Sequence, residues 1–140
     1  MNQHIIPDAT FFPFLSEEKS LERAASKIRE KTYNYVKNSR LQSLVLGISG
    51  GIDSALCAAL LRPICQELQI PLIGRSITIE TNKADEIERS IGVGESFCND
   101  FQHLDLTETF LENKKLLINF DDSHLSKMRQ GNMKARMRMM

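Results

Sequence analysis

The fold of this chain is decided by the stretch Leu44-Val45-Leu46-Gly47-Ile48-Ser49-Gly50-Gly51-Ile52-Asp53-Ser54. Residues 44–48 show no alternation of apolar and polar positions, which predicts a strand buried on both faces of a sheet. A glycine-rich turn follows, and a helix is expected to begin near Ser54. A turn between a buried strand and a helix N-terminus is a common place for proteins to bind phosphate groups.

The residue types in this turn favour a nucleotide phosphate chain. Gly50 and Gly51 lack Cβ, so the backbone can turn tightly and approach a phosphate. Ser49 and Ser54 add hydroxyl donors, and the free amides of the helix start favour an anion. Asp53 would repel phosphates unless a cation lay between them. Mg²⁺ bridging Asp53 and phosphate oxygens removes this conflict, because the ion prefers hard oxygen ligands.

Two better-known phosphate-binding loops are excluded by spacing. A Walker A loop needs GxxxxGK[ST], and no lysine is present in this turn. The dinucleotide fingerprint GxGxxG does not fit glycines at positions 47, 50 and 51.

The remaining sequence alternates between strand and helix patterns. The expected elements are, in order, a helix after Ser16, a strand at 44–48, a helix from Ser54, a strand at 72–79, a helix capped by Asn82, a strand near 103–106, and helices at 110–117 and 123–140. Such alternation predicts parallel pairing through right-handed crossovers. We therefore expect residues 1–140 to form a single α/β domain, a Rossmann-like parallel sheet with helices on both faces.

Composition excludes several classes of function. The chain has 140 residues, 41% of them hydrophobic, and a formal net charge of zero, so no global field favours nucleic acid or a membrane surface. The first residues do not resemble a signal peptide, and no apolar run could span a bilayer. Cys57, Cys65 and Cys98 show no metal-ligand spacing and predict reduced, mostly buried thiols of a cytoplasmic protein.

The motif SGGxDS after an apolar strand resembles the signature of the ATP pyrophosphatase, or PP-loop, superfamily. The resemblance implies the adenine nucleotide alpha-hydrolase-like fold and a loop that holds the pyrophosphate end of ATP, so that the product is an adenylate. The implied ATP-binding residues are Gly47, Ile48, Ser49, Gly50, Gly51, Ile52, Asp53 and Ser54, with Asp53 also holding Mg²⁺.

A second motif narrows the resemblance. Residues 131–139, Gly-Asn-Met-Lys-Ala-Arg-Met-Arg-Met, are similar to the GNxxARxRM helix of NAD synthetases. The resemblance implies that Arg136 binds deamido-NAD near a dimer interface and that Tyr35 lies against its pyridine ring. At two positions the chain departs from the family. Arg75 is offset from the family's basic residue in the second strand, and Gln130 replaces an arginine that often precedes Gly-Asn.

The resemblance as a whole implies an ammonia-dependent NAD synthetase. Deamido-NAD would be adenylated by Mg²⁺–ATP with release of pyrophosphate, and ammonia would then displace AMP to give NAD. Residues 1–46 are too few for a glutaminase domain. The family forms homodimers, and the expected first and last helices both carry apolar stripes. Chains of the family continue well beyond a helix like 123–140, so we expect these residues to be an incomplete synthetase lacking the C-terminal part of its domain.

Other functions fit parts of the pattern. A tRNA-thiolating enzyme would need a basic RNA-binding surface and commonly uses cysteine pairs, neither of which the sequence provides. GMP and argininosuccinate synthetases share the loop but would not be expected to carry GNxxARxRM. A non-catalytic or incomplete ATP-binding fragment remains the alternative from outside the enzyme classes.

Overall fold

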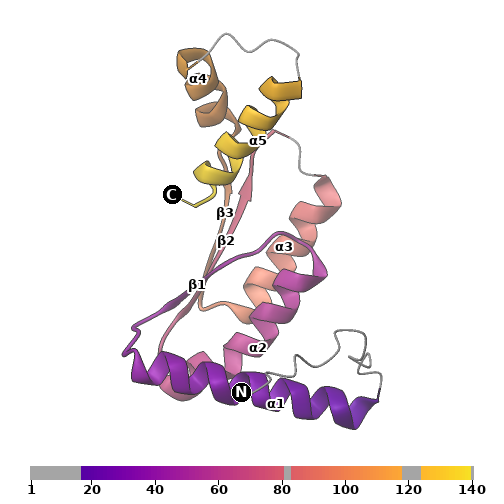
Figure 1. Cartoon of the computed structure of the whole chain (residues 1–140), viewed down its shortest axis with the longest axis vertical. Coiled ribbons are helices and arrows are strands. Elements are labelled where there is room, and N and C mark those ends of the chain that lie inside the picture. Colours follow the sequence, from indigo (N-terminus) through magenta and orange to yellow (C-terminus); the bar gives the residue numbers. More distant parts are fainter. Residues whose placement is uncertain (1–16, 81–82, 118–123, 140) are drawn as a thin grey trace, which may run out of the picture.

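The structure, a computed structural model, describes residues 17–80, 83–117 and 124–139. The elements run along the chain in the order α1 (Glu18–Asn38), β1 (Leu44–Gly47), α2 (Ile52–Leu68), β2 (Leu72–Thr78), α3 (Ala84–Phe97), β3 (Asp100–Asp105), α4 (Thr107–Leu117) and α5 (His124–Met137) (Figure 1). Every expected helix and strand is present, with ends shifted by a few residues. The predicted caps Ser16 and Asn82 lie outside the described residues.

The three strands form one parallel sheet in the order β1-β2-β3. Gly47 at the end of β1 pairs with Arg75 of β2, and Thr78 at the end of β2 pairs with Asp105 of β3. Because α2 and α3 connect successive parallel strands, the chain has the predicted α/β architecture.

One face of β2 is covered by α2 and α3. Leu72, Gly74, Ser76 and Thr78 alternate along β2 and are all buried. A Cβ on Gly74 would lie 2.5 Å from the Cys98 sulfur, so the chain approaches the strand closely here. These contacts hold α3 against the sheet, and α3 in turn faces the loop between β1 and α2.

The opposite face of β2 is covered near its carboxyl end. Ile77 points away from Ser76, and it packs against a buried cluster of Ile79, Phe110 of α4 and Met137 of α5. In Figure 1, α5 lies beside the carboxyl ends of β2 and β3. A helix from the end of the sequence is thereby brought to the edge of the sheet where the loop after β1 emerges.

The prediction that β1 is buried on both faces is wrong for the described residues. Leu44 and Leu46 are half-buried, and Val45 is 69% exposed. β1 is the edge strand of the described sheet, and α2 covers only one of its faces. An unalternating apolar sequence fits a doubly covered strand, but the cover itself comes from other parts of a fold.

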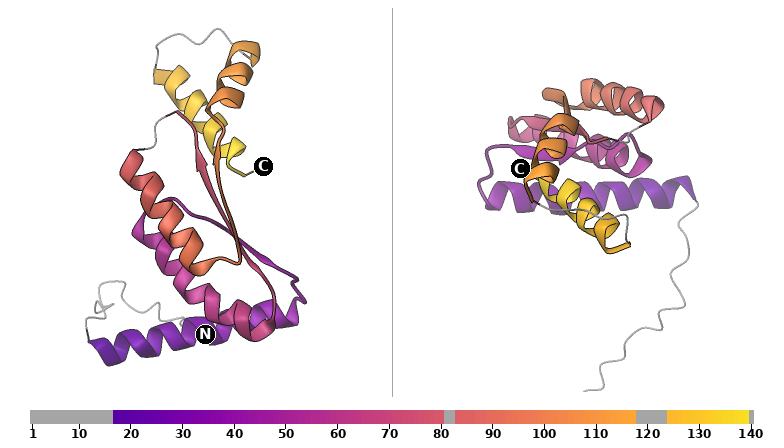
Figure 2. Two further views of the ribbon diagram at one scale, coloured as in Figure 1. Left: turned by 180° about the vertical axis from the view of Figure 1, so that it is seen from behind. Right: turned by 90° about the horizontal axis from the view of Figure 1, so that it is seen from above.

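Helix α1 packs against α2 (Figure 2). Much of its apolar stripe is exposed to solvent. Val36 is its one buried residue among those described, whereas Leu21, Ile28 and Tyr35 are exposed.

Two further sequence predictions concern the cysteines and the apolar length of the helices. All three cysteines are free, and burial raises the pKa of the thiols of Cys65 and Cys98, whereas Cys57 is exposed. No described helix combines the length and the apolar character that crossing a membrane would require.

Candidate functional site

The glycine-rich loop between β1 and α2 is held in place by α3. Gly50 has a φ of +84°, and a Cβ there would collide with the carbonyl oxygen of Glu86. Only glycine fits both the backbone conformation and the space. The Arg89 guanidinium donates from Nε to the Gly50 carbonyl oxygen at 3.0 Å. The loop is therefore shaped by α3 as well as by its own sequence.

The two serines of the loop bond to the loop itself. The Ser54 hydroxyl accepts from the Ser49 amide at 3.2 Å and donates to the Gly51 carbonyl oxygen at 3.0 Å. The Ser49 hydroxyl accepts from the Gly51 amide at 3.2 Å and lies 3.2 Å from the Ser54 hydroxyl. Both hydroxyls thus brace the turn, a role that their spacing alone did not predict.

Helix α2 begins directly after this turn. Its N-cap, Gly51, has no side chain to satisfy the amides of the first turn, and these amides and the helix macrodipole attract an anion. Asp53 lies in that first turn with an exposed side chain. Among the described residues, no hydrogen bond or ion pair engages its carboxylate.

Mg²⁺ fits this donor set only together with phosphate. The described part of the chain contains no group of three or more acidic, histidine or cysteine side chains that could hold a metal ion. Mg²⁺ commonly binds through one or two carboxylates plus phosphate oxygens and water. Asp53 beside an anion-binding helix start provides one such carboxylate, whereas a cage made entirely of protein ligands is absent from the described residues.

A cavity of about 600 Å³ opens beside the loop. Its size is within the range of small-molecule sites. The lining consists of residues 47–51 from the loop, 75–77 from β2, 86–87 and 89–90 from α3, and Arg138. Residues 47–51 of the predicted ATP site therefore line one cavity, whereas Asp53 and Ser54 are not part of its lining. Ile52 lines a second hollow between the loop and α3.

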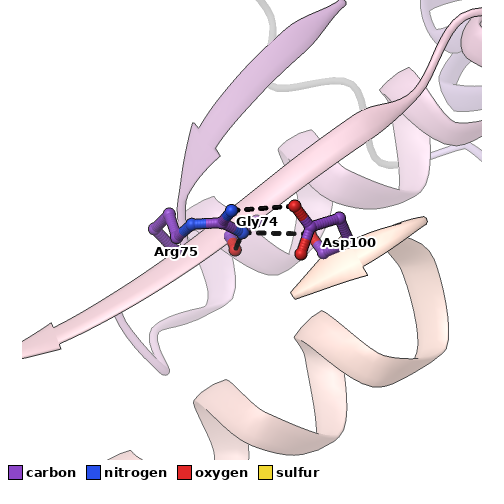
Figure 3. A network of polar contacts seen from close by, with 3 residues as sticks. All are labelled: Gly74, Arg75 and Asp100. Atoms are coloured by element: carbon purple, nitrogen blue, oxygen red, sulfur yellow. Dashed lines mark hydrogen bonds and ion pairs between the residues drawn. The ribbon is translucent and has the colours of Figure 1, made fainter. Parts of the chain in front are cut away.

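Two of the cavity's arginines are paired with carboxylates. Arg75 lies 2.8 Å from the Asp100 carboxylate and donates to the Gly74 carbonyl oxygen at 2.8 Å (Figure 3). Arg89 lies 2.7 Å from the Asp85 carboxylate. The hydrogen bonds from these arginines lower the pKa of Asp100 and of Asp85. The sequence identified Arg75 only as offset from the family's basic residue, and the parallel register of β1 and β2 places it beside Gly47.

Buried hydroxyls form another part of the wall. Ser76 of β2 and Ser90 of α3 are hydrogen-bonded at 2.8 Å, and the Nδ1 atom of His103 lies 3.1 Å from the Ser76 hydroxyl. Both serines line the cavity. Sequence reasoning missed these residues, since no local motif connects positions 76, 90 and 103.

The residues predicted to bind deamido-NAD are not brought to this cavity by the described part of the chain. Arg136 is exposed on α5 and does not belong to the lining. Tyr35 is 68% exposed on α1, and helix α1 lies at the opposite end of the molecule from α5 (Figure 1). Their assignment stays a prediction.

Residues 24–140 match the family model for NAD synthase. The chain belongs to the NAD synthase family. This membership agrees with the phosphate-binding loop and with the helix at 131–139. It favours the NAD synthetase interpretation over the GMP synthetase and tRNA-thiolating interpretations.

Relatives identified by sequence are ammonia-dependent enzymes. The chain is 34% identical over 125 residues to an NH(3)-dependent NAD(+) synthetase of Campylobacter jejuni subsp. doylei, covering 87% of this chain and 45% of that protein. It is 31% identical over 108 residues to one of Lacticaseibacillus casei, covering 74% and 39%. The chain thus spans about two-fifths of the length of the curated relatives it matches.

Solved structures share the fold. The NH3-dependent NAD synthetase of Campylobacter jejuni subsp. jejuni, in complex with a nitrate ion, aligns with a TM-score of 0.68 and 24% identity over 84% of this chain and 48% of that one. The NAD+ synthetase of Burkholderia pseudomallei aligns with a TM-score of 0.66 and 21% identity over 84% and 54%.

Proposed function

We propose that these residues carry the ATP-binding part of an ammonia-dependent NAD synthetase. In the reaction, the nicotinate carboxylate of deamido-NAD attacks the α-phosphate of ATP and expels pyrophosphate. Ammonia then attacks the resulting mixed anhydride at its carbonyl carbon, and AMP leaves as NAD forms. The site's contribution to the first step is electrostatic, because negative charge builds up on the departing pyrophosphate.

The main support for this proposal is that the glycine-rich loop between β1 and α2 lines a cavity. The uncapped start of α2 and the tight turn at Gly50 offer amides to an anion, and residues 47–51 open onto about 600 Å³ of space. The amides of Ser49 and Gly51 donate to the loop serine hydroxyls, so the uncapped amides at the start of α2 are the groups best placed for phosphate oxygens. A nucleotide's phosphate chain fits this arrangement.

Mg²⁺ belongs to the proposal as the partner of Asp53. When bound, the ion supplies positive charge to the phosphate oxygens. Asp53 holds its carboxylate at the start of α2, where it is exposed and free of protein partners among the described residues.

The deamido-NAD site and the quaternary structure are proposed from the family. Arg136 and Tyr35 are proposed to contact deamido-NAD, and both are exposed. The exposed apolar residues of α1 support a homodimer that covers this helix. Because the relatives it matches are about twice as long, we propose that residues 1–140 form one part of the complete catalytic domain.

The test is a comparison of Asp53→Asn with the unaltered 140-residue chain. Titration with ATP should show binding that is strengthened by Mg²⁺ in the unaltered chain, and the Mg²⁺ effect should vanish in Asp53→Asn. Release of AMP and pyrophosphate is then measured with deamido-NAD and ammonia present. We expect weak ATP binding and no NAD from the chain alone. Absence of any Mg²⁺–ATP binding would contradict the proposed function, and turnover by the 140 residues would contradict only their incompleteness.

A further inference from the structure

The last turn of α5 is anchored at Lys134. Its ammonium lies 2.6 Å from the Glu80 carboxylate, and the two side chains are only 18% and 24% exposed. The same ammonium lies over the Phe110 ring, 5.1 Å from the centroid. Since a partly buried ion pair is screened less than a surface one, this pair holds α5 to the exit of β2.

A second anchor lies one turn further along. Met137 is 5% exposed and packs with Ile79 and Phe110. Lys134 and Met137 are three residues apart and therefore share one face of the helix. Together they fix both the position of the helix end and its rotation about its axis.

The residue after Met137 lines the cavity. The Arg138 amide donates to the Lys134 carbonyl oxygen at 3.1 Å, so helical geometry continues to this position, and Arg138 belongs to the cavity lining. Arg136 precedes it by two residues, which is about 200° around the helix axis. One arginine of the motif thus lines the same cavity as the loop, whereas the other lies outside that lining.

Arg138 also differs from the cavity's other arginines in its partners. Arg75 and Arg89 are each held by a carboxylate, at 2.8 Å and 2.7 Å. Within the described ranges, the Arg138 guanidinium has no hydrogen bond or ion pair. An unpaired guanidinium in a cavity that is also lined by the phosphate-binding loop matches a phosphate, whose oxygens accept two parallel hydrogen bonds from arginine.

We propose that Arg138 binds the phosphate chain of the nucleotide from the side opposite the loop. The Lys134–Glu80 pair is a positioning pair, because it acts on the nucleotide only by holding Arg138 in place. This inference rests on the proposed function and deepens it: the helix at 131–139 contributes to the ATP site through Arg138, separately from the role proposed for Arg136.

The test uses inorganic pyrophosphate, Mg²⁺–ATP and adenosine as separate probes of the 140-residue chain, with binding followed by NMR titration. Arg138→Gln should weaken pyrophosphate and ATP by about tenfold, the size expected for one charged hydrogen bond. Adenosine should bind equally well, because it carries no phosphate. Arg129→Gln is the matched control, because it makes the same change at an exposed position of α5 outside the cavity lining, and it should leave all three affinities unchanged.

A double-mutant cycle tests the positioning pair. Lys134→Gln should weaken pyrophosphate binding in the unaltered chain but should have no further effect on it in Arg138→Gln. If Lys134 were merely structural, the substitution would weaken pyrophosphate binding equally whether or not Arg138 is present. Glu80→Gln repeats the cycle from the other partner if Lys134→Gln unfolds. Equal pyrophosphate binding by Arg138→Gln and the unaltered chain would overturn the inference alone. An unaltered chain that binds neither pyrophosphate nor ATP would overturn the proposed function as well.

Discussion

Arg75 of β2 reaches across the sheet to Asp100, the first residue of β3, and the two side chains form an ion pair 2.8 Å long (Figure 3). The same guanidinium donates to the carbonyl oxygen of Gly74. These bonds turn the charge of Arg75 toward β3 and keep it as part of the cavity wall. The first prediction follows from the effect of this pair on Asp100.

Stability should fall in acid through the paired aspartates. The Arg75 hydrogen bond lowers the pKa of Asp100, and the Thr107 hydroxyl lowers that of Asp105. A lowered folded pKa stabilises the protein above the unfolded value of about 3.9, and this contribution is lost as pH falls through the folded pKa. We would measure the free energy of unfolding by urea denaturation from neutral to strongly acidic pH. Between these limits it should decrease less for Asp100→Asn than for the unaltered chain. Parallel curves would contradict this assignment.

Gly50→Ala should destabilise the fold by about 1–3 kcal/mol from backbone strain, because alanine is strained at positive φ. The collision of its Cβ with the Glu86 carbonyl oxygen should add to this loss. Gly92→Ala is the matched control. Gly92 lies inside α3, and a methyl group added there would meet no atom within 4 Å, so alanine should stabilise by about 0.5–1 kcal/mol through helix propensity. Chemical denaturation gives both values, and similar midpoints for the two variants would refute the steric account.

Arg136→Ala should affect deamido-NAD and spare ATP. The proposed charged hydrogen bond predicts a loss of about 1.5–3 kcal/mol in deamido-NAD binding. Because Arg136 lies outside the cavity lining, ATP affinity should barely change. Calorimetric titration of a complete synthetase carrying the substitution separates the two ligands, and a larger effect on ATP would reverse the assignment.

Helix α1 should be part of a dimer interface. Leu21, Ile28 and Tyr35 recur every two helical turns and are exposed. An obligate interface would bury more than about 1,200 Å². Ile28→Glu should shift the protein from dimer to monomer in light scattering, whereas Lys27→Glu, an exposed neighbour on α1, should not. Monomer at all concentrations in the unaltered protein would rule out the dimer.

The sequence by itself determined the local part of this protein. Residues 44–54 specify a strand, a glycine-rich turn and a helix start that attracts an anion, because each depends on neighbouring residues, whereas the space that restricts position 50 to glycine is set by Glu86 of α3. The strand–helix alternation was enough to predict the parallel sheet, since parallel strands require long crossovers.

Tertiary structure decided what surrounds that loop. The exposure of Val45 depends on which helices cover β1, and the partners of Arg75 and Arg89 depend on strand register and on the packing of α3. Arg138 lines the same cavity as the loop because Lys134 and Met137 hold α5 against Glu80 and Phe110. These contacts join residues far apart along the chain, so their geometry is set by packing of the whole sheet rather than by any local pattern.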